Sequence, residues 1–106
     1  MGTRYGSREH PDMQGLVACA RKVAGLIGAQ DVPDAELSGF VESILFGEKD
    51  AWQCAVMGLI TREETANLLL AHLETWLMSR ANLDCLEPMP WDLEPLRHEF
   101  EDALFG

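Results

Sequence analysis

The stretch ITREETANLLLAHLETWLMSR, from Ile60 to Arg80, decides the fold that this sequence predicts. Thr61 and Glu64 form a T-x-x-E capping box, in which each side chain satisfies a backbone donor of the first helical turn. Leu68 and Met78 point roughly away from the main apolar face, so we expect this helix to occupy the middle of a bundle. The main face follows helical spacing and consists of Ala66, Leu69, Leu70, Leu73 and Leu77.

Helical patterns continue on both sides of this stretch. Apolar residues recur at helical spacing in residues 12–27, 33–46 and 92–104, and each of these segments predicts an amphipathic helix. A short and mostly apolar helix is expected at residues 50–57, and its composition indicates that it is largely buried. With the central helix at residues 61–80, the predicted fold is all-α, a compact bundle of about five helices.

Short polar residues and glycines mark the ends of these helices. We expect the first helix to end at Gly28 and the central one at Asn82, because glycine and asparagine tolerate the left-handed conformation that terminates helices. Aspartate is a favoured N-cap residue, because its carboxylate accepts hydrogen bonds from first-turn amides. The predicted N-caps of the other four helices are Asp12, Asp31 or Asp34, Asp50 and Asp92.

Two segments interrupt the helical pattern. Residues 1–11 contain several turn-forming residues and no apolar period, so we predict a flexible N-terminal arm there. Residues 81–91 contain Pro88 and Pro90, which cannot continue a helix, together with apolar residues. This second segment is predicted to be a strap across the bundle, and residues 12–106 are expected to form a single helical domain.

The chain is strongly acidic, with a formal net charge of -10 over 106 residues. Such a surface repels nucleic acid and anionic lipid, and it attracts basic protein surfaces. We therefore expect no direct nucleic-acid partner, although the charge could also serve solubility alone. We predict no membrane partner either, because no apolar run reaches the roughly 20 residues of a membrane helix. A polar N-terminus and an odd number of cysteines favour a cytoplasmic location; the cysteines are Cys19, Cys54 and Cys85.

One segment partly matches a calcium-binding loop, but it lacks essential ligands. Residues 53–64 match a twelve-residue calcium loop at its glycine, its ninth position and its final carboxylate. The first, third and fifth ligand positions, however, would be Gln53, Ala55 and Met57, and two of these lack a side-chain oxygen. The capping box of the next helix explains the same residues.

Metal and cysteine chemistry have little support in the sequence. Cys85 lies beside Asp84 and Glu87, and this acidic setting disfavours the reactive thiolate. We therefore predict a protein without cofactor, metal or enzymatic activity. The histidines do not stand at metal-ligand spacing from one another or from the cysteines; they are His10, His72 and His98.

The function that remains is binding to another protein. The leading hypothesis is a small acidic inhibitor, antitoxin-like factor or adaptor that occupies a partner's surface. That surface would be a basic nucleic-acid-binding site, which the carboxylates fill by imitating phosphates, in the manner of phage-encoded inhibitors. Trp91 is proposed as an interface anchor. The predicted partner-binding residues are Glu63, Glu64, Glu74, Trp91, Asp92, Glu94, Glu99, Glu101 and Asp102.

One alternative belongs to a different class of function. A homodimer could use the second apolar side of the central helix, at Leu68 and Met78. Such a protein would be a structural or ligand-sensing subunit without catalysis. Within the last helix, Glu94 and Glu101 stand three and four residues from Arg97, so we also expect ion pairs across its turns.

Overall fold

The structure is a computed structural model, and it describes residues 10–83 and 91–106. In these ranges five helices form and no strand is present, which confirms the all-α bundle. The predicted arm and most of the predicted strap lie outside the described residues. The helices are α1 (Met13–Ile27), α2 (Asp34–Phe46), α3 (Ala51–Val56), α4 (Arg62–Arg80) and α5 (Glu94–Phe105).

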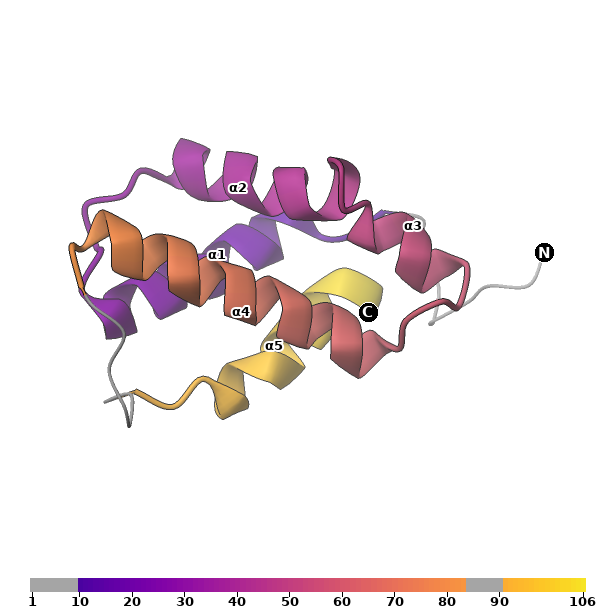
Figure 1. Cartoon of the computed structure of the whole chain (residues 1–106). Helices are drawn as coiled ribbons and strands as arrows, with labels where there is room; N and C mark the ends of the chain where they lie inside the picture. Colours follow the sequence, from indigo (N-terminus) through magenta and orange to yellow (C-terminus); the bar gives the residue numbers. More distant parts are fainter. Residues whose placement is uncertain (1–9, 84–90) are drawn as a thin grey trace.

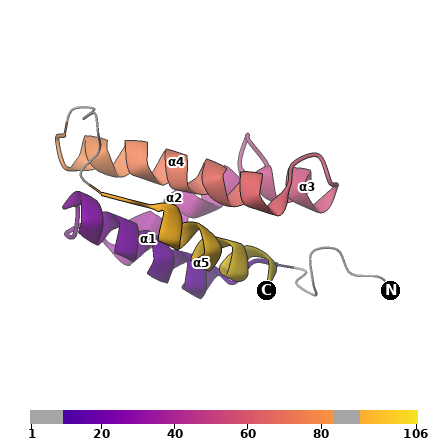
Figure 2. The same ribbon diagram turned by 90° about the horizontal axis from the view of Figure 1, so that it is seen from below.

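The four longer helices alternate in direction along the molecule (Figure 1). Helices α1 and α4 run one way and α2 and α5 run the other, while α3 lies at the end where α2 finishes and α4 begins. Figure 2 shows α4 and α3 on one side of the molecule and α1 and α5 on the other. Because α4 contacts each of the other helices, the predicted central position of this helix is confirmed.

Leucine is the most frequent residue of the core, and the predicted face of α4 is buried as expected. Met78, on the second apolar side of α4, is 7% exposed and belongs to the core, which agrees with a helix in the middle of the bundle and removes Met78 from the surface that the dimer alternative requires. Leu68 is half-buried. The reason is that neighbours cover α4 on more than one side, so its buried face is wider than one apolar stripe.

Stacked aromatic rings join α3 to α5 and α2 to α4. Trp52 stacks on Phe105 with ring centroids 5.6 Å apart, and Phe40 stacks on Trp76 at 4.4 Å. Such pairs stabilise a core by more than the area that they bury. The Trp52–Phe105 pair holds the short helix α3 against the C-terminal turn of α5.

Four of the predicted helix ends are confirmed. The Asp12 carboxylate accepts a hydrogen bond from the Gly15 N–H at 3.0 Å, and both bonds of the Thr61–Glu64 capping box are present. Gly28 and Asn82 adopt left-handed conformations, with φ of 96° and 58°. The Asp12 N–H also donates to the Ala103 carbonyl oxygen at 2.7 Å, which joins the start of α1 to the end of α5.

The other three predicted caps are wrong. Helix α2 follows Pro33 and has no side-chain cap, because the Asp34 carboxylate pairs with Arg21 instead. Asp50 precedes α3 with φ 49° and ψ 46° and makes no capping bond, since a capping side chain requires an extended backbone at that residue. Asp92 accepts from the Glu94 N–H at 3.0 Å, but Leu93 is the residue at the N-cap position of α5.

Candidate functional site

Three of the predicted partner-binding carboxylates surround one arginine of α5. The Arg97 guanidinium lies 2.9 Å from Glu63 of α4, 2.7 Å from Glu94 and 2.9 Å from Glu101. The two pairs within α5 confirm the expected ion pairs across its turns. We call these four residues the Arg97 clasp. The hydrogen bonds that Arg97 donates to the Glu94 carboxylate raise the pKa of Arg97 above its ordinary value. The Arg97–Glu63 pair joins α5 to α4.

Other predicted partner-binding residues also have partners inside the molecule. Glu74 accepts a hydrogen bond from the Trp91 indole N–H at 2.6 Å, and Trp91 is half-buried against the core. Glu99 of α5 pairs with Lys22 of α1 at 2.5 Å, and this hydrogen bond raises the pKa of Lys22. The predicted acidic residues therefore do not form one free face, because most of them connect helices or cap them.

Three free carboxylates lie close together in the sequence, around the turn between α2 and α3. Glu48 and Asp50 lie in the turn between α2 and α3, and Glu42 lies one helical turn before the end of α2. Residue spacing alone could have indicated that Glu42 is unpaired, because the residues four positions away are Ser38 and Phe46. Five carboxylates in the described ranges take part in no hydrogen bond or ion pair: Asp31, Glu42, Glu48, Asp50 and Asp102.

Large apolar side chains are exposed in the same part of the chain. Phe46 is 46% exposed at the end of α2, Met57 is 62% exposed after α3, and Leu59 is 68% exposed before α4. We expected residues 50–57 to be largely buried, but this is correct only for the inward side of α3. We define the α3 corner as Phe46, Met57 and Leu59 together with the free carboxylates Glu42, Glu48 and Asp50.

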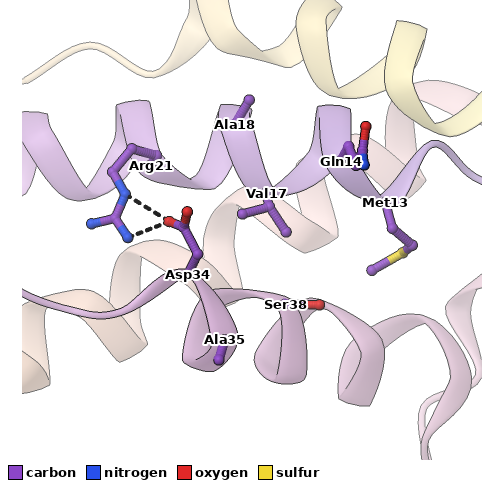
Figure 3. A pocket seen from close by; sticks show the side chains of 8 residues that line it. All are labelled: Met13, Gln14, Val17, Ala18, Arg21, Asp34, Ala35 and Ser38. Carbon is purple, nitrogen blue, oxygen red and sulfur yellow. Dashed lines mark hydrogen bonds and ion pairs between the residues drawn. The ribbon is translucent and has the colours of Figure 1, made fainter.

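A shallow groove of about 570 Å³ runs between α1 and α2 (Figure 3). Arg21 and Asp34 pair across it at 2.5 Å, and Arg21 also donates to the Gln30 carbonyl oxygen at 2.9 Å. The charged groups of the groove therefore satisfy each other, and its remaining walls are largely apolar or small. The lining residues are Met13, Gln14, Val17, Ala18, Arg21, Asp34, Ala35 and Ser38.

A second hollow of about 360 Å³ lies between α1 and α5, and Cys19 is part of its wall. Burial raises the pKa of the Cys19 thiol, and the nearby carboxylates, Glu99 first among them, raise it further. A raised pKa keeps this sulfur protonated near neutral pH, which makes it a poor nucleophile. Cys85, the cysteine that we expected to be most exposed, lies outside the described residues.

Neither a metal centre nor a membrane span is found in residues 10–83 and 91–106. No group of three or more histidine, cysteine, aspartate or glutamate side chains in these ranges is arranged to hold a metal ion. No helix formed by these residues combines the length and the apolar character needed to cross a membrane. The residues that suggested a calcium loop form α3 and the capping box of α4 instead.

Comparisons of the chain with models of protein families, with curated proteins and with solved structures find no match. The carboxylates and the exposed apolar side chains are therefore the features that bear on its function.

Proposed function

We propose that this chain is a small acidic protein-binding factor, such as an inhibitor, an antitoxin-like factor or an adaptor, which occupies a basic surface on a partner protein. One observation carries the proposal. The described ranges hold fifteen acidic side chains and six basic ones, and four of the six basic side chains pair with carboxylates of the same chain. These four are Arg21, Lys22, Arg80 and Arg97.

Because the positive charges are largely used within the molecule, the surplus of carboxylates faces solvent. A surface of this sign attracts basic proteins over about one Debye length, roughly 8–10 Å at physiological salt. Complementary charge mainly speeds association and selects partners. The same surface opposes the approach of nucleic acid and anionic lipid, which supports a protein as the partner.

Imitation of nucleic acid is the sharper form of this proposal. It requires carboxylates that stay available to a partner's lysine and arginine side chains. In the Arg97 clasp three carboxylates share one guanidinium, so this face remains negative but is partly neutralised. The α5 face is therefore a weaker imitation of a phosphate backbone than its sequence suggests.

The homodimer alternative has less support. It needs an apolar face at Leu68 and Met78, but Met78 is buried and Leu68 is half-buried. Two copies of an acidic chain also repel each other. Sedimentation at increasing protein concentration measures this directly, and a stable dimer at low salt would favour the alternative.

The proposed function can be tested by affinity capture in the native host, followed by elution with a salt gradient and mass spectrometry. We expect a partner with a basic binding site that elutes between low and moderate salt, because exposed charge pairs are screened by salt. An unrelated acidic protein of similar size on a parallel column controls for non-specific ion exchange. A partner that is retained at high salt, or one that is itself acidic, would contradict the proposal.

Competition tests the sharper form. If the partner binds nucleic acid at the same site, added duplex or single-stranded DNA should release it from the column. A partner that binds DNA and the acidic chain at the same time would rule out imitation of nucleic acid. The broader proposal, that the chain binds a basic protein surface, would still stand.

A further inference from the structure

We propose that the α3 corner is the contact surface for a basic amphipathic segment of the partner, one with apolar side chains flanked by lysine or arginine. This inference rests on the proposed function and makes its partner specific. It departs from the sequence prediction, which placed the contact on carboxylates of α4 and α5 and on Trp91 and Asp92. The corner combines exposed apolar groups, a fixed backbone and carboxylates that have no partner among the described residues.

The apolar part of the corner consists of side chains that a soluble domain would normally cover. Met57 is 62% exposed and Leu59 is 68% exposed, and they are separated by a single glycine. Phe46 adds an aromatic ring that is 46% exposed. Apolar and aromatic residues that gather on a surface and are rimmed by polar groups mark interaction sites.

Backbone hydrogen bonds show that the exposed segment is a fixed part of the fold. The Met57 N–H donates to the Gln53 carbonyl oxygen at 2.9 Å, and the Leu59 N–H donates to the Cys54 carbonyl oxygen at 2.8 Å. Gly58 between them adopts φ 81°, in the left-handed region. Both side chains are therefore held outward by an ordered turn, and a preorganised surface loses less entropy on binding.

The turn on the other side of α3 is also fixed. A Cβ atom at Gly47 would lie 2.3 Å from the Ser43 carbonyl oxygen, so only glycine fits at this position. The Gly47 carbonyl oxygen accepts a hydrogen bond from the Asp50 N–H at 3.1 Å. Phe46 and the carboxylates of Glu48 and Asp50 are therefore presented by a tight turn.

The unpaired carboxylates of the α3 corner favour a basic partner. The carboxylates of Glu42, Glu48 and Asp50 make no hydrogen bond or ion pair with another described residue, and Lys49 is the one basic residue of the described segment 42–60. A basic partner would not have to displace an internal cation here, whereas at the Arg97 clasp it would compete with a guanidinium. Apolar anchors beside free carboxylates complement apolar side chains beside lysine or arginine.

The dimensions of the corner suit a short helix of the partner. Helix α3 has six residues and spans about 9 Å, which is close to two turns of an approaching helix. Phe46 precedes α3 and Met57 follows it. Figure 1 places α3 at one end of the bundle, beyond the main run of α1 and α5.

A fluorescent synthetic peptide provides the probe. It should form an amphipathic helix with leucine on one face and lysine on the flanks, and a scrambled peptide of the same composition is its control. Anisotropy titrations of the full chain at low and moderate salt should show binding of the amphipathic peptide at least roughly tenfold tighter than the scrambled one. Equal binding of both peptides would overturn the inference, because charge alone would then explain the contact.

A matched pair of leucine variants tests whether the peptide binds at the α3 corner. Leu26 of α1 is 49% exposed and lies outside the corner, so Leu26→Ser is the control for Leu59→Ser. We expect Leu59→Ser and Met57→Ser to weaken peptide binding by roughly tenfold, and Leu26→Ser to change it by less than about twofold. Circular dichroism verifies that each variant is folded. Equal weakening by Leu59→Ser and Leu26→Ser would overturn the assignment of the corner.

Two further outcomes would also overturn the assignment of the α3 corner. The proposed function and the proposed contact surface can also fail separately. A dimer that Leu59→Ser abolishes would mean that a second copy covers the corner. Binding to neutral phosphatidylcholine vesicles that Leu59→Ser abolishes would mean that a lipid surface covers it. If the native partner elutes at moderate salt and Leu59→Ser does not weaken its binding, the proposed function stands and the corner is wrong. If no basic partner or peptide binds, both proposals fail.

Discussion

The Arg97 clasp and the α3 corner are both acidic, but their carboxylates have different roles. In the clasp, Glu63, Glu94 and Glu101 share the guanidinium of Arg97, whose side chain is 14% exposed, and this links α5 to α4. In the corner, the carboxylates have no partner among the described residues, and the same segment of the chain carries exposed apolar side chains. A net charge therefore gives the surplus of acidic over basic groups, while the fold decides which acidic groups remain available to a partner.

The largest difference between the two regions should appear in stability. Phe100 lies in α5 near the clasp and is completely buried, whereas Leu59 of the corner is 68% exposed. We expect Phe100→Ala to lower the free energy of unfolding by about 3–5 kcal/mol, because it removes apolar contacts and leaves a cavity. Leu59→Ala should change the free energy of unfolding by less than about 0.5 kcal/mol.

Urea unfolding followed by circular dichroism measures both variants. A large loss for Leu59→Ala would show that this side chain supports the fold, and the corner would no longer be a surface free for binding. Interpretation requires equal denaturant slopes for wild type and variants, since a changed slope indicates a changed denatured state.

Substitutions at the N-terminal ends of α4 and α3 should differ in their effect on stability by an intermediate amount. The Thr61 side chain accepts a hydrogen bond from the Glu64 N–H at 3.0 Å, so Thr61→Ala should cost about 1 kcal/mol. Asp50 makes no capping bond and has a left-handed backbone. Because glycine tolerates that conformation, Asp50→Gly should change stability by less than about 0.5 kcal/mol. If thermal unfolding shows equal losses, Asp50 contributes to stability by some contact other than a cap.

The smallest effect concerns two glutamates of α2. Glu36 pairs with Arg80, and this hydrogen bond lowers the pKa of Glu36 below its ordinary 4.5, while Glu42 is unpaired. A lowered pKa in the folded state means that the pair stabilises the protein above about pH 4.5. This contribution is lost as the pH falls further and Glu36 becomes protonated.

Glu36→Gln should therefore lower the thermal midpoint near pH 7 and have little effect near about pH 3. Glu42→Gln should leave the midpoint unchanged at both values, and it serves as the matched control. The expected shift is small because both partners of the pair are partly exposed. A loss for Glu36→Gln that persists in acid would show that the side chain acts through packing and not through its charge.

The fold was predictable because its signals are local. Apolar residues at helical spacing and the Thr61–Glu64 capping box located each helix to within two residues of its observed bounds. The errors arose where distant residues intervened. The Asp34 carboxylate, for example, pairs with Arg21, thirteen positions away, and makes no cap for α2. This contact is not visible in the spacing of neighbouring residues.

The candidate site was less predictable for the same reason. The carboxylates of α5 form a conspicuous run in the sequence, but Glu99 pairs with Lys22, which lies 77 positions away. Conversely, Met57 belongs to the segment 50–57, whose apolar composition indicated burial, yet it is 62% exposed. Composition predicted an acidic surface, and the tertiary structure was needed to tell its free charges from its paired ones.

The hydrogen bond between the Asp12 N–H and the Ala103 carbonyl oxygen, 2.7 Å long, brings the two ends of the helical domain together. Neighbouring ends allow a domain to be inserted into a loop of a host protein or joined to itself by a short linker. Both connections between the inserted domain and the host protein would then lie close together. The bundle could thus be carried as a compact insert by another protein, with its helices undisturbed.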